Sequence, residues 1–162
     1  MVKVTYLGEG RFEGSNGRNK IEIYPANYSP VELFLTGAVA CSAVDVVELA
    51  ARQQVQLEGL EVELEFKRKE SYPKIFTEFH LIYKIEAPEV EPIRAQRWVL
   101  SSLETYCSTL NTLRATTKIY YSILLNREQI AYKEGIISGT GGELKLESFD
   151  DDLDGLGCCC AH

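Results

Sequence analysis

The spacing of hydrophobic residues changes repeatedly along the chain, and each change predicts a new element. Short apolar segments separated by turn residues predict a meander of three strands, at residues 2–7, 11–14 and 19–24. A nearly all-apolar stretch then predicts a helix over residues 30–54. Ser29 suits its N-cap, Pro30 its first position, and Glu32 completes a capping box. Because almost every face of this helix is apolar, we expect it at the centre of the fold.

The next part of the chain changes to strict alternation of apolar and polar residues. Apolar residues occupy every second position at Leu60, Val62, Leu64 and Phe66, and again at Phe79, Leu81, Tyr83 and Ile85. Each run predicts a strand with one solvent-exposed face, and the turn "ESYPK" joins the two strands into a long hairpin. The remaining pattern predicts a helix over residues 92–105, a short helix from residue 108 and a strand over residues 118–125. The expected fold class is therefore α+β, with a strand meander, a long central helix, a β-hairpin and a second helix pair.

The length and the net charge of the chain limit the kinds of function that it can have. The chain has 162 residues, and we expect one domain over residues 1–137, followed by an acidic flexible tail over residues 138–162. The formal net charge is −7, of which the residues after Ile137 contribute −5, leaving −2 and no basic face for nucleic acid. The first residues lack a signal-peptide pattern, so a cytoplasmic location is expected. The longest apolar run, residues 33–44, is too short to span a membrane.

The cysteines leave two interpretations open. Five are present, at positions 41, 107, 158, 159 and 160, and a cytosolic chain keeps such thiols reduced. Cys41 lies in the apolar helix, where a cysteine is commonly a small core residue, yet Asp45 and Glu48 share its helical stripe. Cys107 precedes a short helix, whose N-terminal N–H groups favour a thiolate. The pair is therefore either structural or reactive.

A reactive thiolate beside carboxylates requires a nearby cation, because negative charge raises a thiol pKa. The candidates are Arg11 and Arg18 in the first hairpin and Arg114 on the helix after Cys107, although each by itself is typical of a surface arginine. His80 falls at an outward strand position and His162 ends the tail, so the sequence indicates no Cys–His dyad.

The last residues of the sequence contain a separate group of possible metal ligands. Three adjacent thiols, Cys158, Cys159 and Cys160, are followed by His162. Thiolate and imidazole groups suit zinc or copper, so metal handling remains an alternative function.

Two motifs connect the chain to a known family. "SPVELFLTGAVACSAVDVVELA" surrounds Cys41, and "YCSTLNTL" surrounds Cys107. With this order of elements, residues 2–126 resemble the OsmC and Ohr family of thiol-dependent hydroperoxide reductases. The resemblance implies an interlocked homodimer and organic hydroperoxide resistance under oxidative stress. It also implies a peroxidase without metal or haem, reduced by an external thiol or dithiol.

The resemblance also implies roles for four residues. Cys41 is the peroxidatic cysteine, which attacks the hydroperoxide and becomes a sulfenic acid, and Cys107 is the resolving cysteine, which condenses with it to a disulfide. Arg11 is the arginine that stabilises the thiolate, and Glu32 stands one residue after the position of the family glutamate.

Two positions depart from the family pattern. Val31 stands where a glutamate directly follows the helix-starting proline, and Ser108 stands where a proline commonly follows the second cysteine. These departures motivate the alternative of a non-catalytic protein that binds a small molecule on the same fold.

Overall fold

The computed structural model describes residues 1–24 and 26–138. In chain order the elements are β1 (Lys3–Gly8), β2 (Arg11–Ser15), β3 (Lys20–Ile23), α1 (Pro30–Arg52), β4 (Gly59–Arg68), β5 (Phe76–Glu86), α2 (Pro92–Ser101), the π-helical segment η1 (Ser102–Tyr106), α3 (Ser108–Leu113), β6 (Lys118–Leu125) and β7 (Glu128–Gly135). The chain divides into two compact units, of which the first is Met1–Gly37 and the second begins at Ala38. The α+β class is confirmed.

The first unit contains the predicted meander and the start of α1. Strands β1, β2 and β3 pair antiparallel in that order, with Tyr6 opposite Phe12 and Phe12 opposite Ile23. The capping box is also confirmed. The Ser29 N–H donates to Glu32 Oε2 at 2.7 Å, and the Glu32 N–H donates to Ser29 Oγ at 3.2 Å.

The second unit is built on a four-stranded sheet in the order β4-β5-β6-β7. The predicted hairpin is the antiparallel pair of β4 and β5, whereas β5 and β6 run parallel. A parallel pair needs a long crossover, which here contains α2, η1 and α3. One face of β5 is fully apolar and buried, through Phe79, Leu81, Tyr83 and Ile85. The alternation in the sequence predicted this face.

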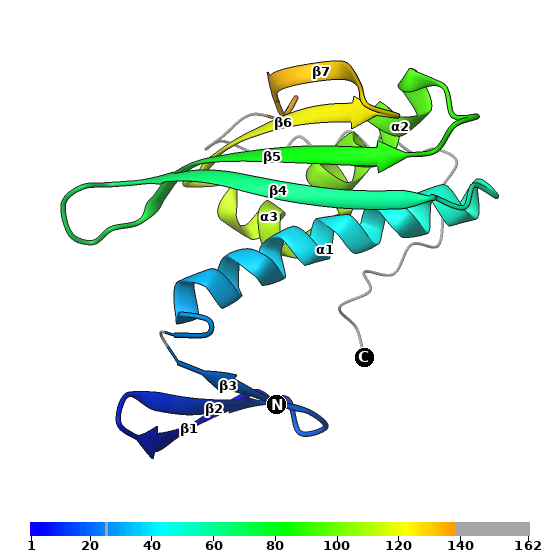
Figure 1. Cartoon of the computed structure of the whole chain (residues 1–162). Coiled ribbons are helices and arrows are strands. Elements are labelled where there is room, and N and C mark those ends of the chain that lie inside the picture. The colour runs from blue at the N-terminus through cyan, green and yellow to red at the C-terminus, as the bar shows by residue number, and fades with distance from the viewer. Residues whose placement is uncertain (25, 139–162) are drawn as a thin grey trace. The chain divides into compact units, whose positions relative to one another are not determined.

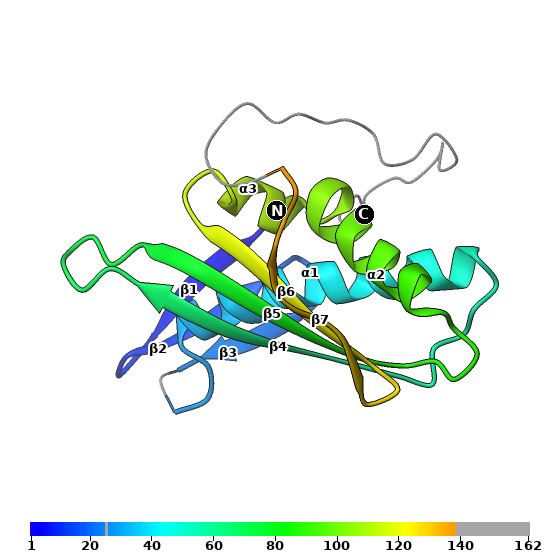
Figure 2. The same cartoon turned by 90° about the horizontal axis from the view of Figure 1, so that it is seen from above.

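The helices of the second unit cover that buried face of the sheet (Figures 1 and 2). Among the described residues, α1 is the one helix long and apolar enough to cross a membrane by length and composition, so the limit expected from the apolar run at residues 33–44 does not hold for the whole helix. Core helices of folded proteins pass the same test, and in α1 the side chains of Ala38, Val46 and Ala50 are buried. Val44 and Val47 of the same helix are exposed, so one face of α1 packs into the core of the second unit and the expected burial on almost every face is not found.

Strand β7 was not predicted from the sequence. It pairs antiparallel with β6 after a two-residue turn in which Asn126 and Arg127 have φ values of 50° and 70°. Positive φ at both turn residues is typical of the tight hairpins that suit the twist of a sheet. The segment "EQIAYKEG" has few apolar residues and the turn lacks glycine, so neither signal is present in the sequence.

The environment of His80 differs from the predicted outward position on an exposed strand face. The side chain points away from the helices but is buried, with Nε2 at 2.8 Å from Ser122 Oγ and Nδ1 at 3.1 Å from Glu65 Oε2. The Lys133 N–H of β7 donates to the same Ser122 oxygen at 2.8 Å. Ser122 therefore connects the unpredicted strand to His80 through hydrogen bonds.

Candidate active site

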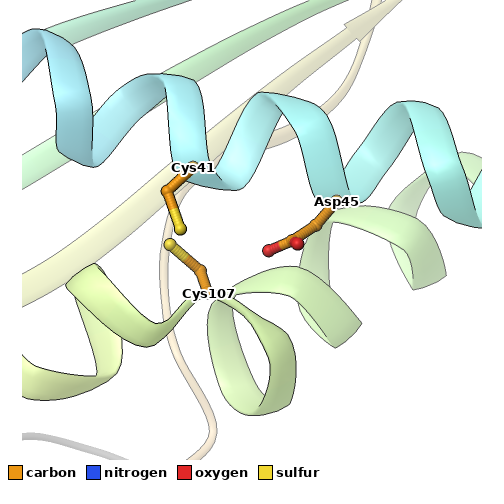
Figure 3. Close-up of side chains that lie close together, drawn as sticks. All are labelled: Cys41, Asp45 and Cys107. Carbon is orange, nitrogen blue, oxygen red and sulfur yellow. The ribbon is translucent and has the colours of Figure 1, made fainter. Parts of the chain in front are cut away.

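The fold brings together the two cysteines that are 66 residues apart in sequence. Cys41 lies in α1, and Cys107 follows η1 as the N-cap of α3. The two sulfur atoms and a carboxylate oxygen of Asp45 all lie within 4.8 Å of one another. Figure 3 shows the two thiols pointing toward each other, with the carboxylate beside them. We call these three side chains the thiol–carboxylate cluster.

The two thiols differ in accessibility. Cys41 is 9% exposed, whereas Cys107 is fully buried. Cys41 is therefore the more accessible residue of the two.

Cys107 is held in place by the turn that it ends. Its N–H donates to the Ser102 carbonyl at 2.9 Å, and its sulfur lies 3.2 Å from Thr109 Oγ1. Burial, with a smaller contribution from the neighbouring Cys41, raises the pKa of the Cys107 thiol to about 12, although Thr109 and a backbone N–H partly oppose this. The N–H group at the helix start does lower the pKa of Cys107, as expected, but burial outweighs it in a helix only six residues long.

Asp45 is 5% exposed and belongs to a chain of buried hydroxyl groups. Ser102 Oγ donates to Asp45 Oδ2 at 3.0 Å, Ser42 Oγ lies 2.8 Å from Ser102 Oγ, and Tyr83 OH lies 2.6 Å from Ser42 Oγ. Each hydroxyl has one proton, so the hydrogen bonds run from Tyr83 through both serines to the carboxylate. Burial raises the pKa of Tyr83 well above its ordinary range, which keeps this phenol protonated.

Sequence reasoning did not identify the hydroxyl chain. Ser42 is adjacent to Cys41, and Tyr83 is the one residue with a hydroxyl on the predicted apolar face of its strand. The positions of these two residues in the sequence could therefore have indicated the hydroxyl chain. Ser102 gave none, because nothing in the sequence shows that η1 turns its hydroxyl toward α1.

The candidate cation Arg114 has another role. Its Nη1 lies 3.3 Å from Glu104 Oε2, and both side chains are buried. Nη1 also donates to Ser138 Oγ at 2.7 Å. Arg114 is therefore not the surface residue that the sequence suggested, and its positive charge is compensated by Glu104.

The other candidate residues lie in the first unit. Arg11 is 44% exposed at its side chain, with Glu9 at 3.9 Å and Glu22 at 4.0 Å, and Arg18 lies in the loop between β2 and β3. Glu32 caps α1, and its hydrogen bonds to Ser29 lower the pKa of its carboxyl group. The roles of Arg11 and Glu32 toward Cys41 remain predictions.

Within the described residues, the thiol–carboxylate cluster is also the one group of three converging His, Cys, Asp or Glu ligands. A structural zinc site closes its shell with four such ligands, one more than converge here. Cys158, Cys159, Cys160 and His162, the proposed metal ligands of the tail, lie outside the described residues.

Comparison with known proteins decides the family. The model of the OsmC family, described as OsmC-like protein, matches residues 24–122. The chain belongs to this family. The matched part of this OsmC-like chain contains Cys41, Cys107 and Glu32, whereas Arg11 precedes it.

Individual relatives agree with this assignment. Protein YhfA of Escherichia coli K12 is 32% identical over 94 residues, which cover 58% of this chain and 70% of YhfA. A hypothetical protein from Aquifex aeolicus VF5 has a solved structure with a TM-score of 0.69 and 26% identity, covering 77% of this chain and 96% of that one. An organic hydroperoxide resistance protein OsmC from Legionella pneumophila has the same fold, with a TM-score of 0.56 and 19% identity over 76% of this chain and 96% of that one.

Proposed function

We propose that this OsmC-like protein is a thiol-dependent peroxidase that reduces organic hydroperoxides with Cys41 and Cys107. The observation that carries the proposal is the approach of the two sulfur atoms within 4.8 Å in a buried cluster. The two thiols also point toward each other, as disulfide formation requires (Figure 3). The name of the Legionella pneumophila neighbour, an organic hydroperoxide resistance protein, supports the same activity.

The environments of the two thiols support separate roles. Cys41 is the more accessible residue of the two, and its sulfur attacks one oxygen of ROOH as a thiolate. The O–O bond breaks, the alcohol ROH leaves with a proton, and Cys41 becomes a sulfenic acid. Buried Cys107, a thiol at neutral pH, then forms the disulfide with loss of water. An external thiol or dithiol reduces the disulfide, so the cycle requires no metal or haem.

The preferred substrate is an apolar hydroperoxide. Val44 follows Cys41 by three residues on α1 and is 42% exposed. Leu33 and Phe34 add apolar side chains at the start of the same helix. An apolar R group gains contact with such side chains, whereas hydrogen peroxide does not.

We also infer that the protein is a homodimer, to which Arg11 contributes the cation for the Cys41 thiolate. Large apolar side chains are exposed on both units, at Val4, Tyr6, Leu7, Phe12, Ile21, Val44 and Val47. Exposed apolar residues in this number indicate a surface that another chain covers. Sedimentation velocity should give about twice the monomer mass of 18.2 kDa, and a purely monomeric species at micromolar concentration would contradict this inference.

Peroxide consumption tests the catalytic proposal directly. With cumene hydroperoxide and dihydrolipoamide, we expect Cys41→Ser to lose turnover by at least ~10³-fold, because the attacking sulfur is absent. Cys107→Ser should complete one turnover and accumulate the sulfenic acid of Cys41.

The tail thiols provide the matched control. A full-length variant with Cys158, Cys159 and Cys160 all changed to Ser should keep the rate of the unmodified protein. Equal rates for the Cys41→Ser variant and the unmodified protein would overturn the proposal. Absence of turnover in the unmodified protein would also overturn it, and would favour small-molecule binding on the same fold.

A further inference from the structure

Asp45 is a buried carboxylate whose place beside two thiols needs a chemical reason. A negative charge at this distance disfavours a thiolate, so Asp45 does not help to ionise the attacking Cys41. A carboxylate beside a protonated thiol is instead suited to accept its proton. The relevant chemistry is therefore a step in which a thiol of the cluster must lose a proton.

The resolving step has this requirement. Cys107 must lose its proton when its sulfur attacks the sulfenic acid of Cys41, and the departing hydroxyl must gain a proton to leave as water. Cys107 is fully buried, so bulk water does not reach it to carry the proton. Burial also raises the pKa of this thiol to about 12, so a thiolate is scarce at neutral pH.

We propose that Asp45 is the proton-transfer residue of disulfide formation between Cys107 and Cys41. This role rests on the proposed function and adds a catalytic residue to the same site. Asp45 takes the proton of Cys107 as the S–S bond forms, and delivers it to the hydroxyl oxygen as the S–O bond breaks. The sulfur of Cys107 is oxidised, the sulfur of Cys41 is reduced, and one water leaves, so the step needs no further oxidant.

The contacts of Asp45 suit both halves of this transfer. A carboxylate oxygen lies within 4.8 Å of both sulfurs, so one group reaches the donor and the acceptor. Ser102 holds Oδ2 through a hydrogen bond of 3.0 Å, which orients the carboxylate. The hydroxyl chain from Tyr83 and Ser42 ends at Asp45 and stabilises its charged form between transfers.

The titratable groups around Asp45 come from three elements. Cys41 lies on the same helix, Cys107 at the junction of η1 and α3, and Tyr83 on β5. Tyr83 stays protonated, so the proton exchange takes place among Asp45 and the two cysteines. When an external thiol attacks the disulfide at Cys41, the S–S bond breaks, and Asp45 passes the proton of the attacking thiol to the departing Cys107 sulfur.

Single-turnover oxidation of Asp45→Asn tests the proposal in the full-length protein. The amide oxygen can still accept the Ser102 hydrogen bond, but the side chain no longer accepts a proton. After mixing with cumene hydroperoxide, quenched samples are analysed by mass spectrometry for the trapped sulfenic acid and for the disulfide. We expect sulfenic acid formation to change by less than about threefold, and disulfide formation to slow by about 10²-fold or more.

The pH dependence separates proton transfer from simple positioning. In the variant, disulfide formation should accelerate about tenfold per pH unit, because Cys107 must then ionise before its sulfur attacks and the thiolate fraction rises tenfold per pH unit. In the unmodified protein this rate should be nearly independent of pH around neutrality. Glu48→Gln is the matched control, since it removes a carboxylate one turn along the same helix, outside the cluster, and should leave both steps unchanged.

Three outcomes would overturn the proposal: an unchanged disulfide rate in Asp45→Asn, equal slowing of both steps, or the same pH profile in both proteins. If Asp45→Asn does not fold, Asp45→Glu serves instead and should keep the pH profile of the unmodified protein. If the unmodified protein does not react with peroxide, the proposed function fails on its own. The disulfide is then formed with diamide, and slower reduction of it by dithiothreitol in Asp45→Asn would still support the proton-transfer role.

Discussion

The short segment η1 contributes residues to two buried polar clusters. Each cluster contains one carboxylate, and the partners of the two carboxylates differ. Glu104 of η1 meets the guanidinium of Arg114, two backbone N–H groups and the Ser138 hydroxyl. Asp45 of α1 instead meets the Ser102 hydroxyl and two thiols. We call the Glu104, Arg114 and Ser138 side chains the ion-pair cluster. A carboxylate among strong donors stabilises a structure, whereas a carboxylate beside thiols is placed to exchange protons.

The ion-pair cluster fixes the segment that contains Cys107. Glu104 precedes the cysteine by three residues and Arg114 follows it by seven, so their contact closes this loop at both ends. Ser138 joins the same cluster from the end of the described chain. Such buried pairs are sensitive to the loss of one partner, because the remaining charge stays buried. The comparison therefore predicts that one cluster determines stability and the other determines reactivity.

The largest effect on stability is expected from Arg114→Met. The substitution keeps a long side chain but leaves Glu104 buried without its cation, so the free energy of unfolding should fall by about 3 to 5 kcal/mol. Urea denaturation monitored by circular dichroism measures this change. At a temperature where the variant is folded, its rate of peroxide consumption should remain within about threefold of the unmodified protein.

The double variant Glu104→Gln with Arg114→Met controls for the buried charge. It should recover part of the lost stability, because no unpaired carboxylate remains. A loss below about 1 kcal/mol in the single variant would show that the ion pair does not support the fold. A folded variant without turnover would show that the two clusters do not divide stability and reactivity between them.

The sequence predicted those features of the fold that depend on local pattern. The capping box of Ser29 and Glu32 and the alternation that buries Tyr83 follow from neighbouring residues alone. The placement of Cys107 beside Cys41 followed from the resemblance to a family, since spacing alone cannot show which helices meet. Strand β7 was missed because its pairing with β6 depends on tertiary contacts rather than on its own apolar residues.

Burial accounts for the largest differences between the sequence predictions and the structure at the candidate site. Arg114 resembled a surface residue until its pairing with Glu104 was known, and Cys107 seemed suited to a thiolate until its full burial was known. A polar side chain in the sequence does not show which partner will accompany it into the core. The contacts of Asp45 with Ser102 and the thiols could not be predicted for the same reason, because they are tertiary contacts between residues of α1, η1 and α3.

The smallest effect is expected from the ionisation of Cys107 in alkaline solution. Its pKa is raised from 9.0 to about 12 in the folded protein, so the unfolded chain loses this proton first. The stabilisation is complete below pH 9 and decreases as the pH rises toward 12. The slope from one such group is at most about 1.4 kcal/mol per pH unit.

Comparison with Cys107→Ala isolates this contribution. Urea unfolding is measured for both proteins from pH 8 to about 10 with a phosphine reductant, and the tail thiols, which both proteins contain, cancel in the difference. Tyr83 and Tyr121 also have raised pKa values, but their ordinary value is 10.0, so a difference that begins near pH 9 belongs to Cys107. If the free energies of unfolding of the two proteins changed with pH in parallel over this range, the Cys107 thiolate would be as stable in the folded protein as in the unfolded chain. In that case Cys107 would need no proton acceptor, and the contrast between the thiol–carboxylate cluster and the ion-pair cluster would lose its chemical basis.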